Sequence, residues 1–169
     1  ALRVGFPIAP LTTFRLGGPA ALFVDAQGDA ALGAVNEAAG STGVPVAVIG
    51  KGSNMLVADD GFPGIVVRLG RGFRWAGRDG DRLSAGGAMP LPAFAGVAMR
   101  HRLSGLEFGV AIPASLGGAV KMNAGAHGGS MSDVLERVEM YPLTGEGGRR
   151  TLAASEAGFA YRRSDLPDG

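Results

Sequence analysis

The 169-residue sequence predicts a two-lobed α+β fold, with a small βαβ lobe followed by a mainly antiparallel sheet lobe that carries helices. The first lobe is indicated by a strand-like run at 21–25 and an apolar run at 44–49, which enclose a stretch with helical periodicity. Two hairpin patterns indicate the antiparallel lobe. We expect the break between the lobes near 70–77, giving domains of 1–72 and 73–169.

In the first lobe, Asp29 is expected to cap a helix over about 30–41 that ends at Gly43. Its inward face would carry Leu32, Val35 and Ala39. The nearly all-apolar run 44–49 predicts a strand buried on both faces and paired in parallel with the first strand.

The same lobe is expected to hold two more strands, at 55–57 and 65–69. Asp59 and Asp60 come directly before a glycine, so turn chemistry explains these two carboxylates better than a metal site does.

The second lobe opens with a predicted hairpin of 73–76 and 82–85 around Asp79-Gly80. An amphipathic helix is expected from Pro90 to about Arg102, followed later by a second hairpin and a short helix near 155–158. The inward side chains of the amphipathic helix would be Leu91, Phe94, Val97 and Ala98, with Met89 and Met99 as core filler. The second hairpin would pair 134–141 with 149–152 through a turn at 144–148.

Composition excludes several classes of function. Sixteen basic and fifteen acidic side chains leave a net charge of +1, so nothing favours nucleic acid or an anionic membrane as partner. Cysteine is absent and there are two histidines, which argues against thiolate chemistry and a zinc centre. No apolar stretch approaches the roughly 18 residues of a membrane span. We therefore expect a cytoplasmic protein without a metal.

The loop that follows the 44–49 strand has the pattern Gly50-Lys51-Gly52-Ser53-Asn54. Alternating glycines let consecutive N–H groups point inward, and Ser53 and Asn54 add side-chain hydrogen bonds, as in an anion cradle. The loop does not match a Walker A motif, because Gly52 follows Lys51 at the position where Ser or Thr is needed. It does not match the dinucleotide-binding fingerprint either, because no third glycine begins a helix. The loop therefore predicts a phosphate site of another kind.

The stretch 104–128 combines six glycines with only two charged residues, Glu107 and Lys121. Glycine weakens helix and strand interiors but allows sharp turns and close approaches. Gly117, Gly118 and Gly125 therefore suggest backbone wrapped against a flat polar ligand with free N–H groups. A tight connection between buried elements remains the alternative.

Four motifs occur in order along the chain: Gly-x-Gly-Ser-Asn at 50–54, Ile-Pro-x-x-x-Gly at 112–117, Met-Asn-Ala-Gly-Ala at 122–126 and Tyr-Arg-x-Ser at 161–164. Together with Thr13–Ala20 and Gly61–Gly64, they resemble the UDP-N-acetylenolpyruvoylglucosamine reductase family, also called UDP-N-acetylmuramate dehydrogenase. The resemblance covers essentially the whole chain. It implies a two-lobed FAD-binding domain of the vanillyl-alcohol-oxidase/UDP-N-acetylmuramate dehydrogenase type.

The resemblance also implies an activity. Family members use NADPH to reduce FAD, and the flavin passes hydride to the enolpyruvyl ether of a UDP-sugar during synthesis of the peptidoglycan precursor. Arg162 would hold the substrate carboxylate and act in catalysis, and Tyr161 would shape the substrate pocket. Pairing of Arg162 with Asp165 on the surface is the alternative.

By the same resemblance, the cofactor-binding residues would be Gly50, Lys51, Gly52, Ser53, Asn54, Met55, Ile112, Pro113, Ala114, Gly117, Gly118, Asn123, Gly125 and His127. Ala114 replaces the commoner glycine of the family, and His127 stands where tyrosine is frequent. A surface histidine without a role in proton transfer is an equal alternative for His127.

The family continues beyond the matching region with a substrate domain that carries a serine proton donor and a glutamate. The sequence has no such motif, so we expect an FAD-binding fragment, inactive alone, of a monomeric enzyme. Two alternatives stay open. One is another flavin oxidoreductase of the same fold, such as a sugar or alcohol oxidase, and the other is a catalytically silent nucleotide-binding module.

Overall fold

The structure is a computed structural model that describes residues 1–145 and 147–167. The chain forms two compact units. The first contains Ala1–Gly72 and Tyr141–Arg150, and the second contains Phe73–Met140 and Thr151–Pro167. Both helices and strands are present, in agreement with the predicted α+β class.

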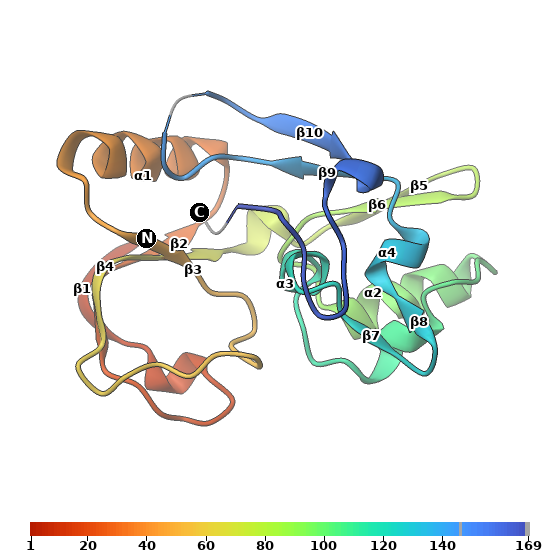
Figure 1. The fold of residues 1–169 in the computed structure, drawn as a ribbon, viewed down its shortest axis with the longest axis horizontal. Helices are drawn as coiled ribbons and strands as arrows, with labels where there is room; N and C mark the ends of the chain where they lie inside the picture. The colour runs from red at the N-terminus through yellow and green to blue at the C-terminus, as the bar shows by residue number, and fades with distance from the viewer. Residues whose placement is uncertain (146, 168–169) are drawn as a thin grey trace. The chain divides into compact units, whose positions relative to one another are not determined.

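The first unit is built on a four-stranded sheet with the order β1-β2-β4-β3 (Figure 1). β1 is antiparallel to β2, whereas β4 lies parallel to both β2 and β3. The elements are β1 (Leu2–Pro7), η1 (Ala9–Leu11), β2 (Pro19–Ala26), α1 (Asp29–Thr42), β3 (Val46–Val48), β4 (Phe62–Leu69) and η2 (Arg71–Phe73).

The predicted parallel pairing of the strands on either side of α1 is wrong, because β4 lies between β2 and β3. The apolar run 44–49 is not a central strand either. β3 is at the edge of the sheet, and Val48 is 41% exposed. The strand buried on both faces is β4, in which Ile65, Val66 and Val67 are all buried. An interior strand loses more water from its side chains, so the longer apolar strand occupies the centre.

α1 follows its predicted span closely and buries Leu32, Val35 and Ala39. It ends at Gly43, whose φ of 69° is left-handed and whose N–H donates to the Ala39 carbonyl. The expected cap by Asp29 is wrong, because Gly28 is the N-cap and no side chain caps the helix. The Asp29 carboxylate instead pairs with Arg149, at 2.5 Å.

The segment Tyr141–Arg150 belongs to the first unit through contacts with α1. Asn36 Nδ2 donates to the carbonyls of Pro142 and Gly145, at 3.0 Å each. The predicted turn 144–148 includes Glu146, which lies outside the described residues.

The predicted strand at 55–57 is absent from the described structure, where this segment is irregular. The residue after this segment, Ala58, is bonded to the loop between β1 and β2, since its carbonyl accepts a hydrogen bond from the Gly18 N–H at 2.9 Å. One buried cluster of this unit contains Ile8, Ala20, Phe23, Ile49 and Val66.

The described residues of the second unit form three two-stranded sheets, three α-helices and two 3-10 helices (Figure 1). Its elements are β5 (Ala76–Asp79), β6 (Arg82–Ala85), α2 (Leu91–Arg100), η3 (Glu107–Ala111), α3 (Leu116–Lys121), β7 (Gly125–Ala126), β8 (Gly129–Ser130), α4 (Met131–Val134), β9 (Arg137–Met140), β10 (Arg150–Ala153) and η4 (Ala154–Glu156). The hairpin around Asp79-Gly80 is present, with its first strand three residues later than predicted.

Helix α2 buries Leu91, Phe94 and Ala98 as predicted, whereas Val97 is half-buried. Met99 is 74% exposed, so its prediction as core filler is wrong. Met89 does pack against the core, which includes Leu91, Phe94, Phe108, Leu116, Val120 and Met131.

Val134 lies at the end of α4, so β9 is shorter than the predicted strand 134–141. The predicted helix near 155–158 is the 3-10 turn η4.

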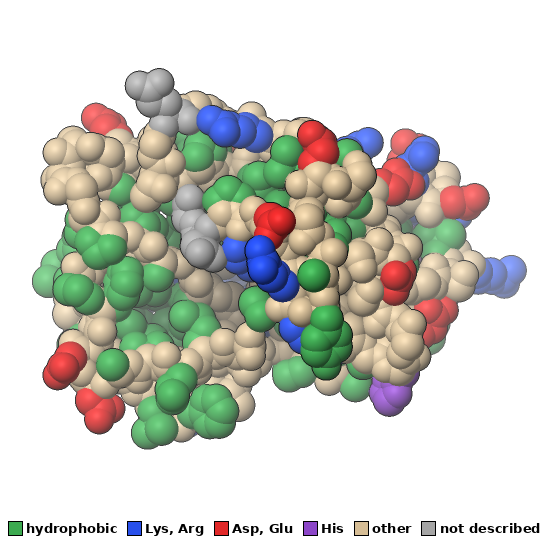
Figure 2. All heavy atoms as spheres, viewed as in Figure 1, with side chains coloured by type: hydrophobic (Ala, Val, Ile, Leu, Met, Phe, Trp, Pro, Cys, Tyr) green, Lys and Arg blue, Asp and Glu red, His purple; other side chains and the backbone are tan. Residues whose placement is uncertain are grey.

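Acidic and basic side chains are interspersed on the face in view in Figure 2. In the described part of the chain, no helix is both long enough and apolar enough to cross a membrane.

Candidate functional site

The glycine loop at 50–54 in the first unit is shaped by backbone packing at Gly52. This residue has a φ of 64°, and a Cβ built on it would lie 2.0 Å from the Leu11 carbonyl oxygen. The Gly52 carbonyl accepts a hydrogen bond from the Thr13 N–H at 3.0 Å. Only glycine combines this left-handed conformation with so close an approach of two backbones. These contacts fix the position of Gly52 at the centre of the loop.

The backbone donors of this loop are available to a ligand. Among residues 1–145 and 147–167, none accepts a hydrogen bond from the N–H groups of 50–54 or from the side chains of Ser53 and Asn54. Gly50, Lys51 and Asn54 are exposed, and the Lys51 ammonium adds positive charge. Successive free N–H groups beside a cation fit the oxygens of a diphosphate. This is the donor set that the sequence predicts.

A second loop, between β1 and β2, packs against the segment that follows the glycine loop. A Cβ at Gly18 would lie 2.0 Å from the Asp59 carbonyl oxygen, so these backbones also touch. Phe14, Leu16 and Leu56 lie on these segments and are exposed. No role is expected for these three apolar side chains from the sequence. These three residues do not follow a helix or strand periodicity in the sequence, so their exposure is known only from the structure.

In the second unit, the predicted free N–H groups at Gly117 and Gly118 are already used. The Gly117 N–H donates to the Gly87 carbonyl at 2.9 Å, and the Gly118 N–H reaches Ser115 Oγ, which caps α3, at 3.4 Å. The expectation that these two donors are free is therefore wrong. The Gly117 N–H is used in packing against Gly87, and the Gly118 N–H is used by the cap of α3.

The motif at 112–114 has a similar structural role. The Ala114 carbonyl accepts from the Leu91 N–H at 2.9 Å, and Ser115 forms an antiparallel bridge with Pro90. These bonds fix the motif beside the start of α2. Binding of the cofactor by Ile112, Pro113 and Ala114 stays a prediction.

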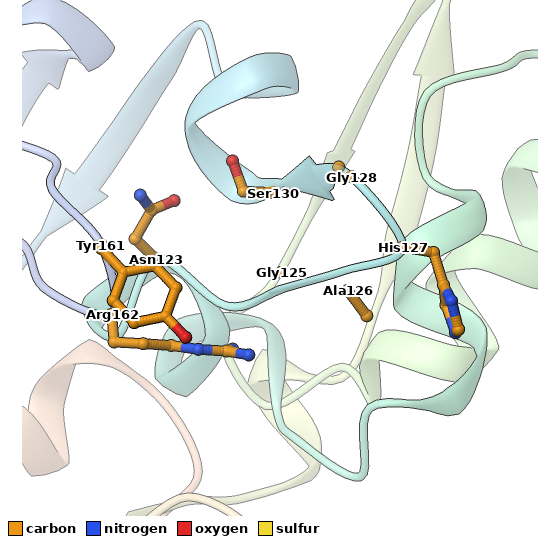
Figure 3. A pocket seen from close by; sticks show the side chains of 9 residues that line it. Asn123, Gly125, Ala126, His127, Gly128, Ser130, Tyr161 and Arg162 are labelled. Atoms are coloured by element: carbon orange, nitrogen blue, oxygen red, sulfur yellow. The ribbon is translucent and has the colours of Figure 1, made fainter.

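A pocket of about 350 Å³ opens in the second unit (Figure 3). It joins the predicted site residues Asn123, Gly125, His127, Tyr161 and Arg162, which come from two separate motifs. The remaining lining residues are Ala126, Gly128, Gly129 and Ser130. The predicted substrate residues and part of the glycine-rich segment therefore form one concave surface.

Tyr161 and Arg162 form the tip of a tight turn. Ala160 and Arg163 exchange two backbone hydrogen bonds, of 3.0 and 3.1 Å, and Arg162 has a φ of 56°. An arginine in this left-handed region carries backbone strain, which is concentrated at functional sites in proteins. The guanidinium carbon lies 5.6 Å from the centroid of the Tyr161 ring, and Figure 3 shows the two side chains side by side. Tyr161 is 90% exposed.

The Arg162 guanidinium forms no ion pair with any residue in the described part of the chain. Asp165, its predicted surface partner in the alternative interpretation, instead binds Arg163 Nη2 at 2.8 Å. The charge of Arg162 is therefore available to an anionic group in the pocket.

His127 lies at the tip of the β7–β8 hairpin with a φ of 54°. Its side chain is exposed and points away from Tyr161 and Arg162 (Figure 3). The His127 side chain is therefore not placed to transfer a proton at the Arg162 end of the pocket. In the described residues, no group of three His, Asp or Glu side chains could hold a metal ion.

The free N–H donors of the glycine loop in the first unit are typical of a nucleotide-binding domain. Residues 20–148 match the FAD binding domain family, and the chain belongs to this family. The predicted FAD cofactor is confirmed by this membership, whereas the residues that hold it stay predictions.

Similar proteins in other bacteria carry the name of one reductase. The chain is 46% identical over 160 residues to UDP-N-acetylenolpyruvoylglucosamine reductase from Heliobacterium modesticaldum, a match that covers 95% of this chain and 50% of the relative. It is 44% identical over 162 residues to the reductase of the same name from Methylorubrum extorquens strain PA1, covering 95% of this chain and 52% of the relative.

Among solved structures, the chain is similar to UDP-N-acetylenolpyruvylglucosamine reductase from Thermus caldophilus. The TM-score is 0.78 at 38% identity, and the match covers 99% of this chain and 57% of that chain. The chain thus spans about half the length of the curated relatives it matches. The resemblance inferred from the four motifs and the α+β fold type are confirmed.

Proposed function

We propose that the chain supplies the FAD-binding part of an enzyme that reduces UDP-N-acetylglucosamine enolpyruvate to UDP-N-acetylmuramate with NADPH. The observation that carries this proposal is the Arg162 guanidinium, which lines the pocket and forms no ion pair with any described residue, so that it can receive an anionic substrate group. The names of the relatives support the same activity. The reaction would belong to the synthesis of the peptidoglycan precursor in the cytoplasm. The complete enzyme would be a monomer.

The glycine loop would bind the cofactor. When bound, FAD supplies the hydride transfer chemistry, accepting hydride from NADPH and delivering it to the substrate. The N–H groups of residues 50–54 would donate to the diphosphate oxygens, and Lys51 would offset their charge. Because Gly52 fixes the loop against the Leu11 carbonyl, little conformational entropy remains to be lost on binding.

Arg162 would bind the carboxylate of the enolpyruvyl group. A guanidinium offers two parallel N–H donors to a carboxylate, and it keeps its charge at all physiological pH values. The same contact would stabilise the negative charge that develops next to the carboxylate when hydride arrives at the enolpyruvyl carbon. Tyr161 would form the side wall and hold the guanidinium by stacking.

The test uses the complete protein with its flavin reduced by NADPH under anaerobic conditions. We expect the enolpyruvyl sugar nucleotide to reoxidise the flavin and to gain two hydrogens, which mass spectrometry detects. Reoxidation by oxygen alone would support an oxidase of the same fold. Failure to bind flavin would support a silent nucleotide-binding module.

A further inference from the structure

The segment that carries Tyr161 and Arg162 is held to the end of α3 at three points. Asn123 Nδ2 donates to the Ala160 carbonyl at 3.0 Å. Ser164 Oγ donates to the Lys121 carbonyl at 2.6 Å, and Lys121 Nζ donates to the Leu166 carbonyl. Of the three contacts, the bond from Asn123 to Ala160 lies at the turn itself. Ala160 begins this turn and is hydrogen-bonded to Arg163 across it.

Asn123 uses both ends of its side-chain amide within the protein. While Nδ2 binds the Ala160 carbonyl, Oδ1 accepts a hydrogen bond from the Ser132 N–H at 2.9 Å. A carbonyl needs a donor and an N–H needs an acceptor, so these two partners fix the orientation of the amide. The amide therefore connects the turn of Arg162 to the beginning of α4.

The backbone of this residue is also unusual. Asn123 has a φ of 42° and is only 9% exposed. Asparagine is among the few residues other than glycine that adopt this left-handed region readily. Asparagine thus meets two requirements at once: the left-handed backbone and a side chain that is donor and acceptor together. Glycine would meet only the first, and aspartate would lose the donor.

We propose that Asn123 is a positioning residue that holds the Tyr161–Arg162 turn, and that its amide acts on the substrate through Arg162 rather than by binding the cofactor. This inference rests on the proposed function, because it assigns Arg162 to the substrate. Without the Nδ2 donor, the turn would lose its connection to α3 at Ala160. The guanidinium would then spend less time in the orientation that binds the carboxylate.

The decisive experiment is a double-mutant cycle in the complete protein with Asn123→Asp and Arg162→Ala. Asn123→Asp keeps the size and the acceptor toward Ser132 but opposes the Ala160 carbonyl with an oxygen. We expect kcat/KM to fall about tenfold or more in the otherwise unchanged enzyme, with FAD still bound at one per chain. In the Arg162→Ala background the same substitution should lower kcat/KM by less than about twofold.

Asn36→Asp is a matched control, since it removes amide donors to the Pro142 and Gly145 carbonyls in the first unit. It should leave kcat/KM within about twofold in both backgrounds. If Asn123→Asp fails to fold, Asn123→Gly replaces it in the cycle, because glycine keeps the left-handed backbone. Equal fold-losses in both backgrounds, or no loss in the unchanged enzyme, would overturn the proposal.

Hydrogen exchange of the complete protein gives a readout that does not depend on activity. Peptides covering 157–166 should exchange faster in Asn123→Asp, while peptides of α1 should not change. If the complete protein proves to have no reductase activity, the proposed function fails, and this measurement alone then decides the positioning role. Unchanged exchange in 157–166 would overturn it.

Discussion

Arg163 Nη2 lies 2.8 Å from Asp165 Oδ1, so the carboxylate three residues after Arg162 is bound by Arg163. Neighbouring arginines thus have different surroundings. Arg163 belongs to an exposed ion pair, and Arg162 stacks on Tyr161 beside the pocket. The two positions form a natural pair of variants.

Arg162→Ala in the complete enzyme should lower turnover by about 10²–10³ while FAD stays bound, because the substrate carboxylate loses its charged partner. Arg162→Lys should recover only part of this loss, since an ammonium lacks the paired donors. Turnover measured at saturating NADPH, with flavin content from absorbance, checks both results. Near-normal turnover of Arg162→Ala would refute the assignment.

Arg163→Ala is the matched control. Its ion pair with Asp165 is exposed on both sides and contributes at most about 1 kcal/mol to the free energy of unfolding. We therefore expect turnover within about threefold of the unchanged enzyme. A loss as large as that of Arg162→Ala would mean that the whole turn, and not the guanidinium of Arg162, is required.

Gly52→Ala should destabilise the first unit strongly. The substitution adds a left-handed alanine, which costs about 1–2 kcal/mol, and a Cβ that would overlap the Leu11 carbonyl oxygen at 2.0 Å, which costs about 1–3 kcal/mol more. Urea denaturation of the complete protein measures the change in the free energy of unfolding.

Gly43→Ala is the control for Gly52→Ala. Gly43 has a φ of 69° as well, but nothing lies within 4 Å of its added Cβ. It should lower the free energy of unfolding by about 1–2 kcal/mol, for the backbone conformation alone. If both variants lose the same amount, the close approach between Gly52 and Leu11 does not contribute.

Arg68 links β4 to β2 by a half-buried ion pair with Asp25 at 2.7 Å, and its guanidinium lies 5.4 Å from the Phe23 ring centroid. Arg68→Met should lower the free energy of unfolding by about 1–2 kcal/mol. Arg82→Met removes an exposed ion pair with Glu136 and should change the denaturation midpoint less.

The pKa of Arg82 is raised by its hydrogen bond and charge interaction with Glu136. A raised folded-state pKa stabilises the fold below the unfolded pKa, and the effect is lost only as pH rises through the folded pKa. Because Arg82 already titrates above the neutral range when unfolded, the effect of Arg82→Met should not vary with pH between about 6 and 9. Denaturation at these two pH values checks this expectation.

Local patterns predicted α1 well, because the spacing of Leu32, Val35 and Ala39 and the left-handed Gly43 are properties of a single segment. The strand order could not be predicted in the same way. Both β3 and β4 have apolar runs, and which one occupies the centre depends on packing across the whole sheet.

In the site, too, properties of a single segment could be predicted, whereas contacts between distant segments could not. The donors of 50–54 are set by a short loop, so their pattern could be recognised in the sequence. The N–H of Gly117 is taken by the carbonyl of Gly87, which lies on a distant segment, so its loss as a donor could not be recognised. The bridging amide of Asn123 was missed for this reason too, since Ala160 and Ser132 meet it only in the folded unit.

The glycine loop gives the last prediction, which concerns affinity for FAD. Ser53→Ala and Asn54→Ala each remove a side-chain donor that no described residue uses, so the fold should retain its stability. Each should weaken FAD binding about 10- to 100-fold, the loss expected for one hydrogen bond to a charged oxygen. Fluorescence titration of the complete apoprotein with FAD measures the Kd.

Lys51→Ala should weaken binding in a way that depends on salt. The ammonium is exposed and acts on the diphosphate as a charge, so its contribution should shrink as ionic strength rises from about 0.05 to 0.5 M. The Ser53→Ala and Asn54→Ala losses should vary less, because their hydrogen bonds act at short range. Ser41→Ala is the control, since Ser41 Oγ bonds only the Ala38 carbonyl in the described structure of α1. If all three loop variants bind FAD as tightly as Ser41→Ala does, the loop is not the diphosphate site.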